Sequence, residues 1–496
     1  MMDKDDRTNE NAVGPEVEAP PYSVFSPRYK AFIVTMVSIA ATFSGISSNI
    51  YHPAIPSVAA DLGTTPEMVN LTVTAYLIFQ GLSPSIWGAI ADVHGRRVTY
   101  IFTFIVYFGA CVGLAETRAF AQLVVLRCVQ STGSASTIAI GAGVIGDITT
   151  REERGGYMGI YQSGLLTPVA IGPILGGIFS ETLGWRAIFW FLAIYSGVYL
   201  VAMIIVLPET LRSLVGNGSI PTKGLATSVQ SWIQRRNLCR SDLETAEAHE
   251  LYPIPQETNK KPPINFLGSI QILIGLEVTY IIVFAAFYYT VWQMIITVMS
   301  TLFKKTYGLS DLQIGLTYLG NGFGCIIGTL TTGKFLDRDY RRFKESHMGA
   351  PEDFPLERAR LRTVWLWSAL QCATVLVFGW TIQFKTHISV PIICTFIMGW
   401  SSTSMISIVS TLVVDIFPKE AASATAAINL LRCLMGAGGV AAVLPLVNAV
   451  GAGWTFTMLT GLSIAGLGLV VLQMGYGRRR RLSRELAQRE ASGQDN

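Results

Sequence analysis

Apolar residues fill most of this chain in long stretches that short polar segments separate. About 20 apolar residues cross a bilayer as a helix. Twelve stretches meet this length, and we expect membrane-spanning helices at 31–52, 68–91, 98–115, 119–146, 157–180, 187–207, 278–302, 312–333, 363–384, 388–414, 421–449 and 454–475. The alternation of period two that a transmembrane barrel requires is missing. The pattern therefore predicts an all-α polytopic membrane protein.

Composition agrees with this prediction and excludes several classes of protein. Half of the residues are hydrophobic and only 14% are charged, whereas soluble domains carry about 25% charge. Soluble domains, coiled coils, disordered chains and secreted disulfide scaffolds are thereby excluded. The net charge of +4 is too small to indicate a nucleic-acid partner. Membrane lipid is the expected surrounding of the protein.

Polar segments divide the chain into five parts. We expect a disordered N-terminal tail (1–30), a first six-helix half (31–207), a central loop (208–267), a second six-helix half (268–475) and a basic C-terminal tail (476–496). Cytoplasmic loops carry an excess of Lys and Arg. With both termini in the cytoplasm, only five basic residues fall in external loops. This orientation is therefore expected, and the central loop and both tails are cytoplasmic.

The two halves repeat short motifs at equal spacing. A glycine, an aspartate and two arginines within 88–97 recur 245 residues later, within 333–342. An aspartate also follows the fourth span (Asp147) and the tenth (Asp415). Parallel repeats of this kind are typical of transporters, which bind substrate near the bilayer midplane where the halves meet. The sequence thus predicts two pseudo-symmetric halves around a central site.

Three motifs resemble signatures of the major facilitator superfamily. Residues 88–97 resemble its loop between spans 2 and 3, and residues 126–133, with Arg127, resemble its fourth-span signature. Residues 172–177 resemble the fifth-span motif of drug:proton antiporters. The resemblance covers residues 30–475 and implies a twelve-helix transporter that works by alternating access.

Further segments narrow the resemblance. Residues 48–54, 79–88 and 429–433 look like the fungal twelve-span drug:proton antiporters, within them the quinidine-resistance branch. Residues 141–149 and 319–324 are similar to the citrate-exporter members of that branch. The resemblance implies efflux across the plasma membrane.

The resemblance also implies a gate at the cytoplasmic end of the second span. Its residues would latch the halves together when the cytoplasmic side is closed, and they are Gly88, Asp92, Gly95, Arg96 and Arg97, with Asp147 and Arg154 as further members. The alternative is a solvated loop that is held only by the positive-inside topology.

Small residues in the fifth span predict a close helix contact. Gly172, Gly176 and Gly177 remove side chains, and Pro173 removes a backbone donor and kinks the helix. We expect a flexible packing seam against the eighth span. Ordinary close packing is the alternative.

Arg127 and Arg432 provide the strongest functional indication, because an arginine at the bilayer centre costs at least about 2.5–3.5 kcal/mol. No Asp or Glu falls inside the twelve spans as placed above. A guanidinium binds a carboxylate as a bidentate fork. The pair therefore favours an anionic substrate. Alternatively, each arginine ties helices together through backbone carbonyls and the neighbouring amide, Gln130 or Asn429.

Other polar and aromatic groups on the expected cavity helices include Asn49, Tyr289 and Trp292, which could line a substrate pocket or only pack. His52 is the last residue of the first expected span and the other four histidines fall outside the spans, so none is an obvious proton relay. Proton antiport would then use Asp92 or Asp147, or the protein would be a facilitator.

These observations predict a secondary active efflux transporter for a small organic molecule. A carboxylate such as citrate is favoured, with a fungal secondary metabolite or a range of drugs as alternatives. A nutrient sensor on a transporter scaffold is a different class that stays open. The spans contain no catalytic constellation, so an enzyme is not expected, nor is a cofactor or a metal. A monomer suffices, because one chain holds both halves.

Overall fold

The computed structural model describes residues 22–150, 153–218, 220, 227, 268–275, 278–346, 356–417, 421–477 and 480. Within these residues, twelve helices are at least 20 residues long. Ten of the candidate helices are both long and apolar enough to cross a membrane, and α3 and α12 are long enough but more polar. The expected all-helical membrane fold is confirmed.

The first half consists of six long helices and two short elements. Its long helices are α1 (Pro27–Asn49), α3 (Pro66–His94), α4 (Arg96–Ala115), α5 (Phe120–Ile148), α6 (Arg154–Thr182) and α7 (Arg186–Val206). After α1 the chain continues as the single turn η1 (His52–Ala54) and the short helix α2 (Ile55–Asp61). A four-residue helix, α8 (Arg212–Val215), follows α7.

The second half also has six long helices. They are α11 (Thr279–Tyr307), α12 (Asp311–Ser346), α14 (Val364–Gln383), α15 (Ser389–Ile416), α16 (Ala421–Val450) and α17 (Ala452–Leu472). Short elements precede α11, precede α14 and follow α17, namely α10 (Gly268–Ile274), α13 (Leu356–Leu361) and η5 (Gln473–Gly477).

Local sequence explains where several helices begin and end. The Ser26 and Thr65 hydroxyls accept a hydrogen bond from the backbone N–H three residues later, and Pro27 and Pro66 occupy the next position, where no N–H partner is needed. Gly308 ends α11 in the left-handed conformation that glycine adopts without strain. These signals fix the helix boundaries near the expected positions.

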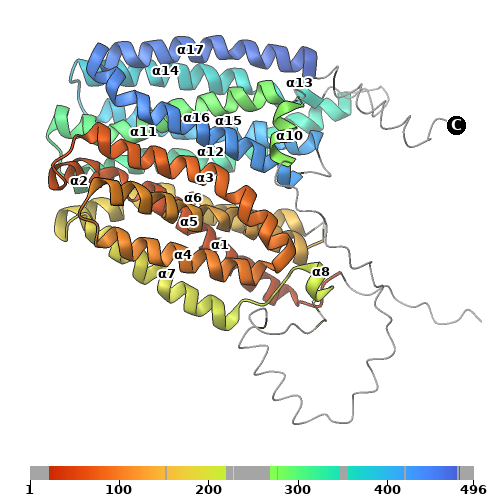
Figure 1. Cartoon of the computed structure of the whole chain (residues 1–496). Coiled ribbons are helices and arrows are strands. Elements are labelled where there is room, and N and C mark those ends of the chain that lie inside the picture. Colours follow the sequence, from red (N-terminus) through yellow and green to blue (C-terminus); the bar gives the residue numbers. More distant parts are fainter. Residues whose placement is uncertain are drawn as a thin grey trace, which may run out of the picture.

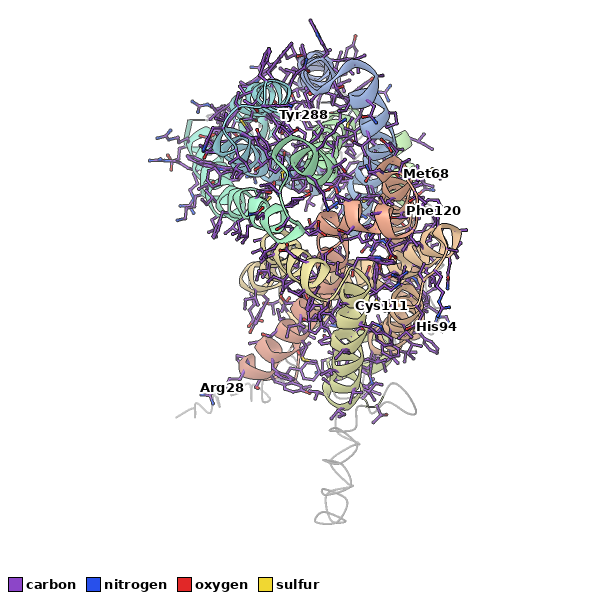
Figure 2. All side chains as sticks on the ribbon, turned by 90° about the vertical axis from the view of Figure 1, so that its left-hand side faces the viewer. Arg28, Met68, His94, Cys111, Phe120 and Tyr288 are labelled. Carbon is purple, nitrogen blue, oxygen red and sulfur yellow. The ribbon has the colours of Figure 1, made fainter. Side chains whose placement is uncertain are left out.

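The two halves lie side by side with their helices running roughly in parallel (Figure 1). Two helix pairs join them, since α6 packs against α12 and α3 packs against α16. Figure 2 looks along the bundle, with Cys111 in the lower, first half and Tyr288 in the upper, second half. This arrangement places a seam between two bundles, as the repeat predicted.

Apolar side chains form the cores of both halves and also cover the outside. Phe43, Phe104 and Tyr107 pack in the first-half core. On the outer faces, Ile194 and Leu366 expose 65% and 63% of their surface. Such apolar outer faces are unfavourable in water and suit a surrounding of lipid tails.

Two helix ends hold buried polar residues that matter for the site. The first helical stretch runs on from Pro27 to Asp61, so His52 lies inside it and is fully buried. Helix α12 begins one residue earlier than expected, at Asp311, which is also buried. Most of the expected tails (1–30 and 476–496) and most of the central loop lie outside the described residues.

Candidate substrate site and the contacts that gate it

Arg127 lies on α5 in the middle of the first half and is completely buried. Its guanidinium sits between the rings of Tyr51 and Tyr76, whose centroids are 4.5 and 4.4 Å from Cζ. Nη1 donates to the carbonyl oxygen of Ser47 at 3.2 Å and to Oε1 of Gln130 at 2.7 Å. Stacking on two aromatic faces stabilises the cation without neutralising it.

Two nitrogens of Arg127 remain without a partner. Nε and Nη2 are buried and find no hydrogen-bond acceptor among the described residues. A buried unpaired donor costs about 1–3 kcal/mol, and more when it is charged. The free edge of this guanidinium therefore favours an acceptor that the protein itself does not supply.

The second half contributes Arg432, on α16. Its Nη2 donates to Oδ1 of Asn429 at 2.8 Å, and its Cζ lies 4.7 Å from the centroid of the Tyr289 ring. Its Nε is buried without a partner among the described residues. Asn429 in turn donates to the carbonyl oxygen of Gln80 on α3, at 3.2 Å. The Arg432 group thus stands at the contact between the halves.

Neither arginine is neutralised by an acidic side chain. The ion pairs among the described residues join other partners, at the ends of the helices. Gln130 and Asn429 each accept one hydrogen bond from their arginine, as the helix-tying alternative expected. The remaining N–H groups exceed what that alternative requires, which favours a binding role.

Aromatic groups of the second half lie next to Arg432. The Tyr289 and Trp292 rings on α11 meet edge to face with centroids 5.5 Å apart, and Trp292 donates to Oδ1 of Asn321 on α12 at 2.9 Å. Asn49 lies elsewhere, with its amide bonded to the carbonyl oxygen of Gly45 one turn earlier. The structure thus brings together Arg432, Tyr289 and Trp292 and leaves Asn49 facing α6.

One end of the bundle is closed by hydrogen bonds between the halves, and we call it the Asp311 end. The hydroxyls of Ser57 and Ser180, both in the first half, donate to Oδ2 of Asp311, the latter at 2.6 Å. Lys304 donates to the other oxygen of Asp311 at 3.0 Å. Asp311 is only 6% exposed, so this contact is sheltered from water.

Two further bonds cross between the halves at the same end. Oε2 of Glu181 on α6 accepts from the backbone N–H of Leu312 at 2.8 Å, and Asn448 on α16 donates to Oε1 of Glu67 on α3 at 2.6 Å. The sequence does not predict these contacts between the halves, because each residue by itself resembles an ordinary polar residue at a helix end.

The opposite end, which we call the Arg96 end, has ion pairs within each half. Arg96 joins Asp92 at 2.6 Å and Asp147 at 3.0 Å, all in the first half. Arg360 joins Asp415 at 2.9 Å, both in the second half. Among the described residues, the ion pairs of the Arg96 end stay within one half while hydrogen bonds join the halves at the Asp311 end, which indicates a conformation sealed at the Asp311 end.

Glu209 organises the Arg96 end and was not identified from the sequence. Its two carboxylate oxygens accept from the backbone N–H groups of Arg96 and Arg97, at 2.8 and 3.2 Å. These N–H groups are the first two of α4, and a carboxylate at the N-terminus of a helix also complements the helix dipole. Gly95 precedes them with φ +107°, a conformation that other residues rarely adopt. The acidic residue directly after the sixth span was the available signal.

Arg97 and Arg154 take different places from Arg96. The Arg97 guanidinium donates to the carbonyl oxygens of Met203 at 3.1 Å and Ile204 at 2.6 Å, at the end of α7. Arg154 begins α6, and its side chain lies outside the described residues. Nearby, Lys30 donates to Glu153 at 2.9 Å, and this hydrogen bond lowers the pKa of the Glu153 carboxyl.

The glycine motif of α6 contacts two helices. A Cβ at Gly177 would lie 2.6 Å from the carbonyl oxygen of Asp311, and one at Gly172 would lie 3.1 Å from Cβ of Asn49. A Cβ at Gly315 on α12 would lie 2.5 Å from the carbonyl oxygen of Pro173. A Cβ at Gly176 would meet the backbone of Ile50. The seam against α12 is thus made by Gly177 and Pro173, and Gly172 and Gly176 lie against α1. Gly88 is less crowded, with only ordinary contact to Ala139.

One protein-family model matches most of the chain. The model of the Major Facilitator Superfamily matches residues 37–440. The chain therefore belongs to the major facilitator superfamily, and it is an integral membrane transporter of small molecules, not an enzyme.

Individual relatives agree with the narrower resemblance. Citrate exporter 1 of Aspergillus niger is 40% identical over 481 residues, covering 94% of this chain and 90% of the exporter. Multidrug transporter QDR2 of Candida glabrata is 35% identical over 485 residues, covering 92% of this chain and 82% of that transporter. Among solved structures, the human organic anion transporter MFSD10 has a TM-score of 0.58 at 15% identity, covering 90% of this chain and 100% of that chain, and so shares the fold.

Proposed function

We propose that this transporter exports a small organic acid, such as citrate, by alternating access. The observation that carries the proposal is the pair of buried arginines, each with N–H groups that no described residue accepts. A carboxylate supplies two acceptor oxygens with the spacing of a guanidinium edge. The 40% identity to a citrate exporter supports the same substrate class.

The substrate would bind first to Arg432 and then, after the change of conformation, to Arg127. In the state sealed at the Asp311 end, substrate enters from the Arg96 end and meets Arg432 and Tyr289, because Arg432 retains some exposure whereas Arg127 is covered by two tyrosine rings. Opening of the Asp311 end would separate the halves there and uncover Arg127. Alternation between two states around one central site is the usual design of repeat transporters.

We also propose the orientation and setting of the protein. Both termini and the central loop would face the cytoplasm, so that the Arg96 end is cytoplasmic and the Asp311 end external, in a plasma membrane. An inside-negative potential favours exit of an anion by about 2.3 kcal/mol per charge per 100 mV. Export would therefore not strictly need protons, although antiport through Asp92 or Asp147 is compatible with it.

The unit of transport would be a monomer with two parts, 31–207 and 268–475. Each chain already supplies both arginines and both sides of the Asp311 contacts. Tails 1–30 and 476–496 would serve topology and contact with anionic lipid.

Export of an uncharged or drug-like molecule is the second candidate. Tyr289 and Trp292 offer aromatic surface beside Arg432, and a multidrug transporter is among the relatives. The same fold can carry either substrate class, so the site chemistry has to be tested directly.

Counterflow in proteoliposomes distinguishes the two. Liposomes loaded with unlabelled citrate take up labelled citrate from the medium if citrate is carried, and a parallel series uses quinidine. The organic-acid proposal expects citrate counterflow in the wild type and its loss in Arg127→Ala and Arg432→Ala. Quinidine counterflow without citrate counterflow would refute it. Repeating net efflux with and without a pH gradient tests proton coupling.

A further inference from the structure

His52 lies in the seam between the halves at the Asp311 end. It begins η1, its side chain is 0% exposed, and its ring stacks on Tyr318 of α12 with centroids 6.2 Å apart and planes 9° apart. Tyr318 is itself fixed by a 2.7 Å hydrogen bond from its hydroxyl to the carbonyl oxygen of Ile296 on α11. The imidazole therefore belongs to the surface along which the halves close.

Both ring nitrogens of His52 lack a hydrogen-bond partner among the described residues. A neutral imidazole leaves one donor and one acceptor unpaired, whereas an imidazolium would leave two donors and a full charge. Burying an unpaired charge is far more costly than burying a neutral polar group. The sealed state therefore selects the neutral ring.

The charged surroundings act in the same direction. The Arg127 guanidinium stacks on the ring of Tyr51, the residue before His52, so a protonated His52 would be close to a like charge. Of the other charged groups at this end, Asp311 and Lys304 pair with each other, Glu181 accepts from the Leu312 N–H, and Asp61 pairs with Arg186. Lys305 at the end of α11 adds one more cation. No carboxylate of the described residues is in place to stabilise a protonated His52.

We propose that His52 is a proton-binding site that controls closure of the Asp311 end. The neutral ring packs on Tyr318 and permits the seal, and a proton taken up when this end opens holds it open. The proposal rests on the orientation given under the proposed function, in which this end faces the outside. External acid would then slow the return of the transporter to the state that loads substrate.

The direction and size of the effect follow from the ordinary pKa of an exposed histidine, about 6.5. In the open state at pH 5.5, only about one ring in ten is neutral and able to seal. The ratio of sealed to open molecules should therefore fall by up to about tenfold per pH unit below 6.5. For a protein that exports acids, this response would limit export once the medium becomes acidic.

A distance measurement without substrate tests the proposal. Spin labels are attached at Arg118→Cys and Ser389→Cys, two exposed positions at the Asp311 end, one in each half. Electron–electron resonance then gives the distribution of distances in full-length protein in nanodiscs, between pH 8 and pH 5. We expect the longer distance to grow as the pH falls below about 6.5, with a midpoint that lies lower the more the sealed state is favoured at pH 8.

Two variants identify the group that takes up the proton. His52→Phe keeps a flat ring for Tyr318 but cannot be protonated, and the distance distribution should no longer respond to pH. His387→Gln removes an exposed histidine of the same end and should leave the response intact. If His52→Phe does not fold, His52→Gln carries the same expectation. A pH response that persists without His52, or none in the wild type, would overturn the proposal.

Because this experiment uses no substrate, its result is independent of citrate transport. Failed citrate counterflow would refute the organic-acid proposal and leave the His52 result standing. The converse also holds.

Discussion

The two arginines of the candidate site lie one in each half, on the fourth and the eleventh long helix, and have different surroundings. Arg127 lies between two tyrosine rings and bonds to Ser47 and Gln130, all within the first half. Arg432 has one aromatic neighbour and bonds to Asn429, which reaches across to α3.

Under the proposed function, the difference predicts a division of roles between the two arginines. Arg127 is a fixed cation whose free edge is covered in the sealed state, and Arg432 is a partly accessible cation at the contact between the halves. One arginine in each half therefore does not imply two equal functions. Four substitutions can break or sharpen this comparison.

Loss of Arg127 should have the largest effect. Arg127→Ala removes two hydrogen bonds and two cation–ring contacts from a fully buried position, and citrate counterflow should fall by about a hundredfold or more. Arg127→Lys keeps the charge but loses the fork, and should recover only part of the activity. Equal rates for Arg127→Ala and wild type would show that this arginine is dispensable.

Arg432→Gln should weaken substrate binding with less damage to the fold, because one aromatic contact and one intrahelical bond are lost. A hydrogen bond to a charged group is worth about 1.5–3 kcal/mol, which corresponds to a rise of about 10- to 100-fold in the citrate Kd. Calorimetric titration measures it. Asn429→Ala removes the side chain that links Arg432 to α3, and this milder variant should raise the Kd by less.

Asp311→Asn should shift the molecule toward opening at the Asp311 end, where the two halves meet. The change removes the charge that Lys304 and two serines stabilise, and we expect about a tenfold shift in the open fraction. The spin-label distances described above report it. Asp61→Asn is the matched control, since Asp61 pairs with Arg186 inside the first half, and it should leave the distances unchanged.

The smallest effect is expected from a substitution in the packing seam between α6 and α12. A methyl group at Gly322 would collide with the backbone of Ala170 on α6, so Gly322→Ala should cost about 1–3 kcal/mol of stability. Thermal unfolding in detergent monitors this loss. Gly468→Ala, at a position with nothing within 4 Å, provides the comparison and should be close to neutral. Identical unfolding temperatures would remove the argument for close α6–α12 packing.

The sequence predicted the helices, the two halves and both arginines, because apolar length and buried charge are local signals. It did not predict Tyr76 over Arg127, since one tyrosine among many in apolar spans carries no distinguishing mark. Asp311 was placed just outside a membrane span and His52 at the last residue of one, because a polar residue at a helix end looks exposed until the facing half is known. Contacts between the halves depend on tertiary packing, which a single sequence does not display.

The central claim is that the unpaired guanidinium groups bind substrate carboxylates. Calorimetric titration of the purified wild type with citrate, and then with its neutral triethyl ester, tests it most directly. We predict heat of binding for citrate, none for the ester, and a Kd at least about tenfold higher in both Arg127→Gln and Arg432→Gln. Binding of the ester as tight as that of citrate, or an unchanged Kd in both variants, would contradict the claim.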